Sequence, residues 1–320
     1  MRLFVARSLP IDAAAVAGAG IEVSVFPHDR APSRDELVAA AREADGLVTL
    51  LSDAVDAALL EAAPRLRVVA NVAVGLDNVD RAACAARGVA VCHTPDVVSA
   101  ATADLTWALI LAVARRLREG DRLVREGGFH GFSPTLLLGL ELEGARLGVV
   151  GFGRIGQAVA RRALGFGMEV VFASRSPVPL AVTGPLQARQ ASLDEVLQAS
   201  DVISLHCPLT PQTHHLISAA RLSRMKRGAI LVNTSRGPII EEAALAEALA
   251  NGRPGGAGLD VYEHEPAVHP SLIGRGDVVL LPHVGSATQA TRARMAEMAV
   301  SDAARVLRGL APLHPAPLHR

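Results

Sequence analysis

The chain has 320 residues, half of them hydrophobic, and its 32 Lys and Arg residues balance 32 Asp and Glu residues. This length is enough for two domains that each bury a core, and the hydrophobic fraction excludes a disordered chain. The balanced charge argues against nucleic acid or a membrane surface as a partner, and no apolar run has transmembrane length. The N-terminus reads directly as a strand and the three cysteines lack metal-binding spacing, so we expect a cytoplasmic protein without a resident metal.

Strand and helix patterns alternate through the first third of the chain. Strands fit residues 3–6, 21–26, 46–51, 66–70 and 89–91, and helices fit residues 12–17, 35–44 and 54–62. Ser33 and Glu36 have the spacing of a capping box at the start of the second helix. This alternation predicts a parallel α/β domain of about 95 residues.

A long helical pattern over residues 99–118 follows, and then a glycine-interrupted stretch over residues 127–131. Later strands fit residues 202–206, 229–233, 257–260 and 278–281, and a closing helix fits about residues 287–310. These elements predict a second α/β unit that starts near Arg146. The fold class is therefore α/β, with two doubly wound parallel-sheet domains.

The most informative motif is Gly151-Phe152-Gly153-Arg154-Ile155-Gly156, which follows an apolar strand pattern and precedes a helical one. Gly151 permits a tight turn, Gly153 lets the backbone approach phosphates, and Gly156 lets the helix pack on the strand. The helix N-terminus presents N–H groups and a partial positive charge to an anion. The motif therefore predicts that this turn binds the pyrophosphate of a dinucleotide.

The end of the next strand indicates which dinucleotide is bound. An NAD site would place an acid there, about 20 residues past the glycines, to bind the ribose hydroxyls. This chain has Ser174-Arg175-Ser176 instead, and Glu169 lies at the wrong end of the strand. Arg175 and the two hydroxyls suit a 2′-phosphate, so we predict a preference for NADP(H), with NAD(H) as the alternative. The alternative interpretation is that Arg175 is only a solvated loop residue in a chain rich in arginine.

Three side chains on strand-end loops could perform hydride-transfer chemistry. Arg236 could bind a carboxylate and a keto oxygen, and His283 could exchange a proton near neutral pH. Glu265 beside His283 would hold the imidazole and favour its protonated form. Each of them alone fits a structural or surface role as well. Together, on successive strand-end loops after a dinucleotide motif, they indicate an active site.

These residues resemble the D-isomer-specific 2-hydroxyacid dehydrogenase family over nearly the whole chain. The matching stretches are Ala73–Asp80, Val149–Gly156, Asn233–Gly237, Gly258–Pro266 and Pro282–Thr288. The resemblance implies that Arg236 binds and polarises the substrate and that Glu265 and His283 form the acid–base pair. It also implies cofactor contacts at Cys207, Pro208, Thr234, Asp260 and Gly285. Substrate contacts are implied at Leu51, Val74 and Gly75, in addition to Arg236 and His283.

The resemblance implies how the domains are organised. Residues 1–98 with 286–320 would form a flavodoxin-like substrate-binding domain, and residues 99–285 a Rossmann dinucleotide-binding domain, with the active site in the cleft between them. It also implies a homodimer built on the region of residues 99–118.

Within the family the chain looks most like the glyoxylate/hydroxypyruvate reductases. The similarity lies in Thr94–Val97, Ala101–Asp104, Phe132–Gly139 and Ser174-Arg175. The implied reactions are glyoxylate to glycolate and hydroxypyruvate to D-glycerate. Leu76 departs from the usual Tyr, and Phe132 departs from a frequent Trp.

Two alternative functions stay open at this point. The same chemistry could act on a bulkier 2-keto acid, a phosphoglycerate or phosphite. A non-enzymatic, dinucleotide-sensing corepressor is the alternative from another class, because fold alone does not decide function.

Overall fold

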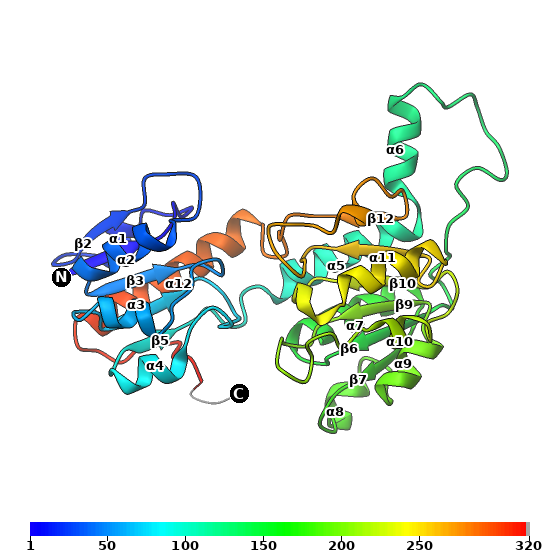
Figure 1. The fold of residues 1–320 in the computed structure, drawn as a ribbon. Helices are drawn as coiled ribbons and strands as arrows, with labels where there is room; N and C mark the ends of the chain where they lie inside the picture. The colour runs from blue at the N-terminus through cyan, green and yellow to red at the C-terminus, as the bar shows by residue number, and fades with distance from the viewer. Residues whose placement is uncertain (318–320) are drawn as a thin grey trace. The chain divides into compact units, whose positions relative to one another are not determined.

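The computed structural model describes residues 1–317 and divides into two compact units (Figure 1). Unit 1 comprises residues 1–98 together with the chain from residue 286 onward, and unit 2 comprises residues 99–285. Residues 318–320, which the sequence assigned to the first domain, lie outside the described residues.

Unit 1 is built on a parallel five-stranded sheet in the order β2-β1-β3-β4-β5. Its strands are β1 Arg2–Val5, β2 Glu22–Val25, β3 Gly46–Thr49, β4 Val68–Asn71 and β5 Ala90–Cys92. Its N-terminal helices are α1 Ala13–Ala17, α2 Arg34–Glu43, α3 Ala57–Ala62 and α4 Arg81–Ala86. Both hydrogen bonds of the predicted capping box are present at α2, which fixes where this helix begins.

The closing helix belongs to unit 1. Helix α12 runs over Gln289–Leu307, shorter at both ends than predicted, because Thr288 caps its start and Gly309 takes a positive φ beyond its end. Its buried face includes Val300 and Ala303, which pack with Leu3 and Val5 of β1 in one core cluster. Burial of this apolar face brings the C-terminal segment back to the sheet formed by the first third of the chain.

Unit 2 is built on a parallel seven-stranded sheet in the order β12-β11-β10-β9-β6-β7-β8. Its strands are β6 Arg146–Val150, β7 Glu169–Ala173, β8 Ala188–Gln190, β9 Val202–Leu205, β10 Ile230–Asn233, β11 Gly256–Leu259 and β12 Val278–Leu280. Its helices include α5 Ser99–Ala114, α6 Leu117–Arg125, α7 Arg154–Ala163, α8 Leu180–Thr183, α9 Leu193–Ala199, α10 Ala219–Leu222 and α11 Glu242–Ala250. The strand order reverses at β6, so the loops after β6 and β9 diverge where ligands of open α/β sheets bind.

Two details of unit 2 differ from the sequence prediction. The predicted helix over residues 99–118 ends at Ala114, and α6 begins after Arg116, whose φ of 51° breaks the helical path. Helix α6 buries none of its residues, and the chain after it exposes Phe132 by 91%. Strand β8 was not predicted, because its short polar sequence gains strand geometry only by pairing with β7 at the sheet edge.

Candidate active site

Two of the predicted catalytic side chains form a hydrogen-bonded pair. Glu265 follows β11 and His283 follows β12, so both lie beyond the carboxyl ends of neighbouring strands. Oε2 of Glu265 lies 2.8 Å from Nδ1 of His283, and Oε1 accepts the backbone N–H of Tyr262 at 3.1 Å. Burial opposes ionisation of Glu265, but the hydrogen bond and charge of His283 outweigh it and hold the pKa of this carboxyl below its usual value.

The pairing assigns different tasks to the two nitrogens of His283. An ionised carboxylate only accepts hydrogen bonds, so Nδ1 must carry the hydrogen that faces Glu265. Nε2 is then the ring nitrogen left to exchange a proton with another molecule. This is the arrangement that an acid–base histidine needs.

Asp260 holds the backbone that carries His283. Its carboxylate accepts the N–H groups of Val284 at 2.7 Å and Gly285 at 2.8 Å, and its carbonyl accepts the N–H of His283 at 2.9 Å. His283 has a φ of 53°, which a residue with a Cβ adopts only when its surroundings enforce it. Burial raises the pKa of Asp260, although the two N–H groups and the charge of His283 act in the opposite direction.

The loop after β10 presents the predicted Arg236. Buried Asn233 donates to the carbonyl of Arg236 at 2.9 Å and accepts the N–H of Ser235 at 3.0 Å. A Cβ on Gly237 would lie 1.8 Å from the carbonyl of Tyr262, so this position has room only for glycine. The Arg236 loop therefore packs backbone against backbone on the loop that leads to Glu265. The charge of Arg236 also contributes to the lowered pKa of Glu265.

The predicted dinucleotide turn has the shape of a phosphate cradle. Gly151 has a φ of 93° and lies so close to the next strand-end loop that a Cβ would be 2.5 Å from the N of Cys207. A Cβ on Gly156 would lie 2.3 Å from the carbonyl oxygen of Gly151, so α7 packs closely on β6. Gly153 caps α7 without a side-chain hydrogen bond, and the space around its α-carbon is open. This turn fits the pyrophosphate of a dinucleotide.

The loop after β7 is held in one conformation by Gln190. The side-chain amide of Gln190 donates to the carbonyls of Ser174 at 3.3 Å and Ser176 at 3.1 Å, and it accepts the N–H of Val178 at 3.1 Å. Arg175 lies on this loop and is exposed. Burial raises the pKa of the Cys207 thiol to about 11, and the charge of Arg175 acts in the opposite direction. Arg175 is thus within electrostatic range of the loop after β9.

The remaining predicted cofactor residues surround the same strand ends. Thr234 is buried, and its hydroxyl lies 2.9 Å from that of Thr106 on α5. The carbonyl of Cys207, next to Pro208, accepts a hydrogen bond from the hydroxyl of Ser235. The first contact joins the loop after β10 to α5, and the second joins the loops after β9 and β10.

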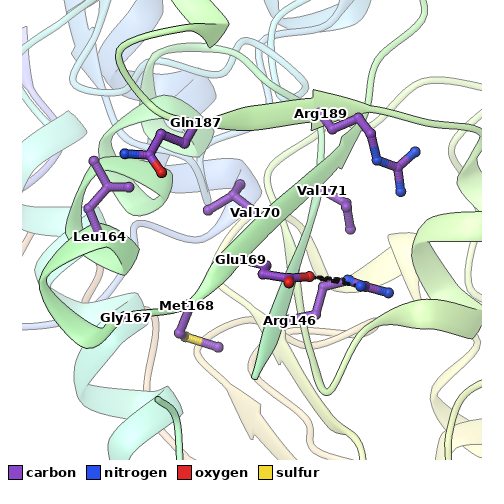
Figure 2. Close-up of a pocket in the computed structure, with 9 residues that line it drawn as sticks. All are labelled: Arg146, Leu164, Gly167, Met168, Glu169, Val170, Val171, Gln187 and Arg189. Carbon is purple, nitrogen blue, oxygen red and sulfur yellow. Dashed lines mark hydrogen bonds and ion pairs between the residues drawn. The ribbon is translucent and has the colours of Figure 1, made fainter. Parts of the chain in front are cut away.

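A cavity of about 460 Å³ lies elsewhere on unit 2 (Figure 2). Its lining includes Arg146 at the start of β6, Met168 before β7 and Arg189 on β8. Arg146 pairs with Glu169 across this cavity at 2.7 Å. The cavity is therefore at the amino ends of the strands, opposite the end that carries the glycine-rich turn, and it is not the predicted cofactor site.

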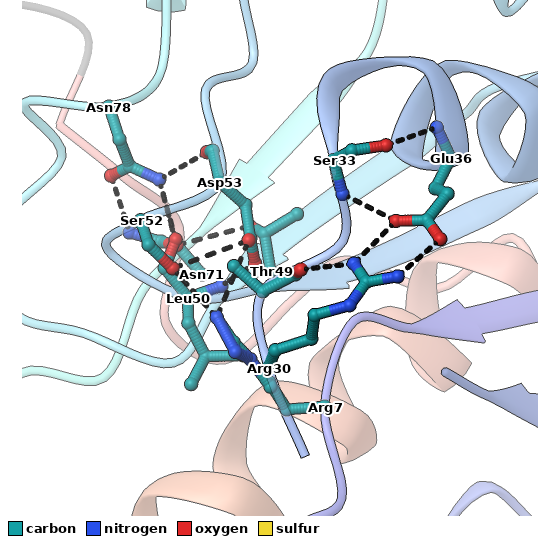
Figure 3. A network of polar contacts seen from close by, with 11 residues as sticks. Arg7, Arg30, Ser33, Glu36, Thr49, Leu50, Ser52, Asp53, Asn71 and Asn78 are labelled. Carbon is teal, nitrogen blue, oxygen red and sulfur yellow. Dashed lines mark hydrogen bonds and ion pairs between the residues drawn. The ribbon is translucent and has the colours of Figure 1, made fainter. Parts of the chain in front are cut away.

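In unit 1, the amides of Asn71 and Asn78 join the strand-end loops, and Asp53 and Arg7 belong to the same network (Figure 3). Asn71 at the end of β4 donates to the carbonyl of Gly75 and to Oδ1 of Asn78, both at 3.1 Å. Asn78 in turn donates to the carbonyls of Leu50 at 2.9 Å and Asp53 at 2.8 Å. This network fixes the loop of the predicted Leu51 relative to the loop of the predicted Val74 and Gly75.

The loop of Val74 and Gly75 has both of its carbonyls engaged by side chains of unit 1. The carbonyl of Val74 lies 3.1 Å from Nδ1 of His93, and the carbonyl of Gly75 accepts from Asn71. A trans peptide places its N–H opposite its C=O, so the N–H of Gly75 points away from His93 and the N–H of Leu76 points away from Asn71. A pair of such groups suits an anionic oxygen.

Comparisons with known proteins agree with this geometry. Residues 107–285 match the family model for the D-isomer specific 2-hydroxyacid dehydrogenase, NAD binding domain. A glyoxylate reductase of Thermococcus kodakarensis is 46% identical over 301 residues, which cover 93% of this chain and 90% of the relative. The chain belongs to the D-isomer specific 2-hydroxyacid dehydrogenase family.

Solved structures extend the likeness to the whole fold of this dehydrogenase. The TT0316 protein from Thermus thermophilus has a TM-score of 0.93 and 47% identity, and the match covers 99% of this chain and 100% of the other. An NADPH-dependent glyoxylate/hydroxypyruvate reductase from Sinorhizobium meliloti has a TM-score of 0.82 and 31% identity, with 99% and 98% covered. The predicted α/β class with two parallel sheets is thereby confirmed.

Several polar residues that hold the predicted site loops within each unit were not assigned a role from the sequence. They are Asn71, Asn78, Gln190, Glu263 and His215. Asn71 could have been noticed as an amide at the end of an otherwise apolar strand, since buried amides are hydrogen-bonded. Gln190 ends the short polar strand β8, and Asn78, Glu263 and His215 lie in polar loops, so no apolar pattern marks them.

Two further findings concern the described residues 1–317. No helix there is long and apolar enough to cross a membrane. That part of the dehydrogenase also has no group of three His, Cys, Asp or Glu side chains arranged to hold a metal ion.

Proposed function

We propose that this dehydrogenase reduces small 2-keto acids, namely glyoxylate to glycolate and hydroxypyruvate to D-glycerate. The observation that carries the proposal is the hydrogen bond between Glu265 and His283, next to the loop of Arg236. The names of the relatives support the substrate class, since one is a glyoxylate reductase and another a glyoxylate/hydroxypyruvate reductase.

The residues of the chain divide the chemistry between them. A nicotinamide dinucleotide supplies the reducing equivalent when bound. Nε2 of His283 donates a proton to the keto oxygen as negative charge develops there, and Glu265 stabilises the imidazolium before that step. The guanidinium of Arg236 binds the substrate carboxylate and polarises the carbonyl. Leu51 and the backbone N–H groups near Val74 and Gly75 complete the proposed substrate contacts.

The cofactor we propose is NADP(H), with NAD(H) as the alternative. The turn of Gly151, Gly153 and Gly156, with Arg154 and Ile155 at the start of α7, would hold the pyrophosphate. Ser174, Arg175 and Ser176 would bind the 2′-phosphate, and no carboxylate on this loop would repel it. Further contacts would come from the strand-end residues Cys207, Pro208, Thr234, Asp260 and Gly285. The NADPH dependence of the Sinorhizobium meliloti reductase supports this choice.

We further propose a homodimer. Helix α6 and the chain after it extend from unit 2 with an exposed apolar surface (Figure 1). The side chains exposed there include Leu117 by 56%, Val124 by 62% and Phe132 by 91%. Exposed apolar surface of this kind marks a protein interface, and the adjoining α5 is the element that the resemblance implies for the dimer.

Initial rates at 340 nm would test the function and the cofactor together. The full-length protein is assayed with glyoxylate and hydroxypyruvate, each with NADPH and with NADH, in wild type and Arg175→Ala. We expect turnover that favours NADPH, and a KM for NADPH raised about tenfold or more in the variant, because one charge-assisted hydrogen bond is lost. The KM for NADH should not change. Turnover with NADH alone would reject the 2′-phosphate site but keep the dehydrogenase.

A panel of bulkier 2-keto acids, with phosphoglycerate and phosphite oxidation, belongs in the same assay. Turnover of one of these in place of glyoxylate and hydroxypyruvate would reject the proposed substrate class. Cofactor binding without turnover of any acid would favour the corepressor alternative.

A further inference from the structure

The structure contains a second histidine–glutamate contact, which the proposed mechanism does not use. Nε2 of His215 lies 2.5 Å from Oε1 of Glu263. Glu263 is two positions before Glu265 on the same loop, and its side chain is 14% exposed. The contact therefore joins the segment between β9 and α10 to the loop that carries the proposed catalytic carboxylate.

Glu263 is also tied to the start of α11 by a reciprocal pair of hydrogen bonds. Its second oxygen accepts the N–H of Glu242 at 2.9 Å, and Oε2 of Glu242 accepts the N–H of Glu263 at 2.8 Å. Oε1 of Glu242 accepts the N–H of His269 at 2.9 Å. The loop is thus held near its beginning and at His269. This cluster holds two carboxylates of low exposure, and the ring of His215 contacts one of them directly.

His215 is itself fixed to the segment that follows Arg236. Its backbone N–H donates to the carbonyl of Pro238 at 2.8 Å, and Ile217 forms an isolated parallel bridge with Ile240. The φ of His215 is 50°, a conformation that a residue with a Cβ holds only when its contacts enforce it. His215 therefore connects the chain after Arg236, through its backbone, with the loop of Glu265, through its ring.

From these contacts we propose that His215 is a positioning residue for the Glu265–His283 pair. The ring holds Glu263, and Glu263 fixes the backbone from Tyr262 onward, whose N–H binds the carboxylate of Glu265. Loss of the ring contact leaves Glu263 held by Glu242 alone, so the loop between them can shift, and a small shift of Glu265 is enough to disturb the orientation of His283. The inference rests on the proposed roles of Glu265 and His283.

Steady-state kinetics of His215→Ala and His215→Gln would test the inference. We expect His215→Ala to lower kcat about tenfold or more, with KM for cofactor and keto acid changed little, because binding groups stay in place while acid–base geometry is lost. His215→Gln keeps a side-chain N–H donor toward Glu263 and should recover most of kcat. His214→Ala is the matched control, because the ring of His214 lies beside that of His215, with centroids 4.0 Å apart and planes tilted by 33°, whereas the contact with Glu263 comes from His215.

Imidazole NMR of the same variants separates this inference from the proposed reaction. The proton between Nδ1 of His283 and Glu265 should give a resonance in wild type, His215→Gln and His214→Ala that is lost in His215→Ala. A wild type without turnover would reject the proposed function, and the resonance would still decide the role of His215. The positioning role is overturned if His215→Ala keeps both the resonance and wild-type kcat, or if His214→Ala causes the same losses.

Discussion

The carboxyl ends of the two parallel sheets are built from different polar groups. In unit 1, the loops after β3 and β4 are joined by the amides of Asn71 and Asn78. In unit 2, the loops after β11 and β12 are joined by the charged groups Glu265, His283 and Asp260. The two sheets share parallel strands and buried strand interiors, so the difference lies in the side chains at the strand ends.

The difference follows from what each edge is proposed to do. Backbone N–H groups bind an anion well when amide side chains hold their peptides in place, and the carboxyl of Asp53 in the same network lies 4.0 Å from the guanidinium of Arg7. Proton transfer requires a group that changes charge, and partners that hold its orientation. Unit 1 therefore corresponds to binding by a fixed backbone and unit 2 to acid–base chemistry. Three changes would test this division.

The largest effect should come from His283→Asn on the charged edge. Asn can keep the contact with Glu265 but cannot donate a proton, so kcat should fall by about 10²–10⁴-fold. Steady-state kinetics and cofactor titration would show this loss with cofactor affinity retained. His264→Asn, an exposed histidine on the Glu265 loop, is the control. Retained turnover in the His283 variant would exclude it as the acid.

A smaller effect of a different kind is expected for Asn71→Asp, which changes one of the two joining amides of unit 1. The new carboxylate places an acceptor against the carbonyl of Gly75, so the loop shifts and the KM for the keto acid should rise about tenfold. The kcat at saturation should change little. Thr49→Val is a milder control, since it removes only the hydroxyl that donates to Asn71. A fall in kcat with unchanged KM would contradict the division between the edges.

The smallest effects concern the pH dependence of stability. One carboxyl group in each unit should contribute, and the two contributions should change in opposite directions as pH falls. The pKa of Glu265 is lowered, so its stabilising contribution is present above the usual carboxyl value of 4.5 and is lost as pH falls through the folded-state value. Burial raises the pKa of Asp53 in unit 1, although Leu50 and Arg7 oppose the shift. Asp53 therefore favours the folded state more as pH falls toward its usual value of 3.8.

Chemical denaturation from pH 7 to about pH 3, which extends below the usual carboxyl values of 4.5 and 3.8, would compare wild type with Asp53→Asn and Glu265→Gln. The stability difference between wild type and Asp53→Asn should grow in favour of wild type on acidification. The difference from Glu265→Gln should shrink. If both stability differences changed in the same direction with pH, the two carboxyl groups would not lie in contrasting environments.

Much of the site could be predicted because its signals are local. The glycines of residues 151–156 must satisfy a turn, a close approach and a helix contact within six positions, so their pattern is readable without the fold. Arg236, Glu265 and His283 each follow an apolar strand, and the carboxyl ends of parallel strands lie at one edge. The absence of an acid after β7 is also a local signal, because the three residues Ser174-Arg175-Ser176 are enough to show it.

The sequence by itself thus determined the fold class, the glycine-rich turn and the side chains that meet at one sheet edge. Only the tertiary structure decided what holds them there. His215 and Glu263 are 48 positions apart, and Gln190 contacts carbonyls 14 and 16 positions away. Such pairs leave no periodic pattern, because a polar residue in a loop reads the same whether water or a distant carboxylate is its partner. Local periodicity records which face of an element is buried, whereas the orientation of a polar side chain depends on packing between elements that are far apart in the sequence.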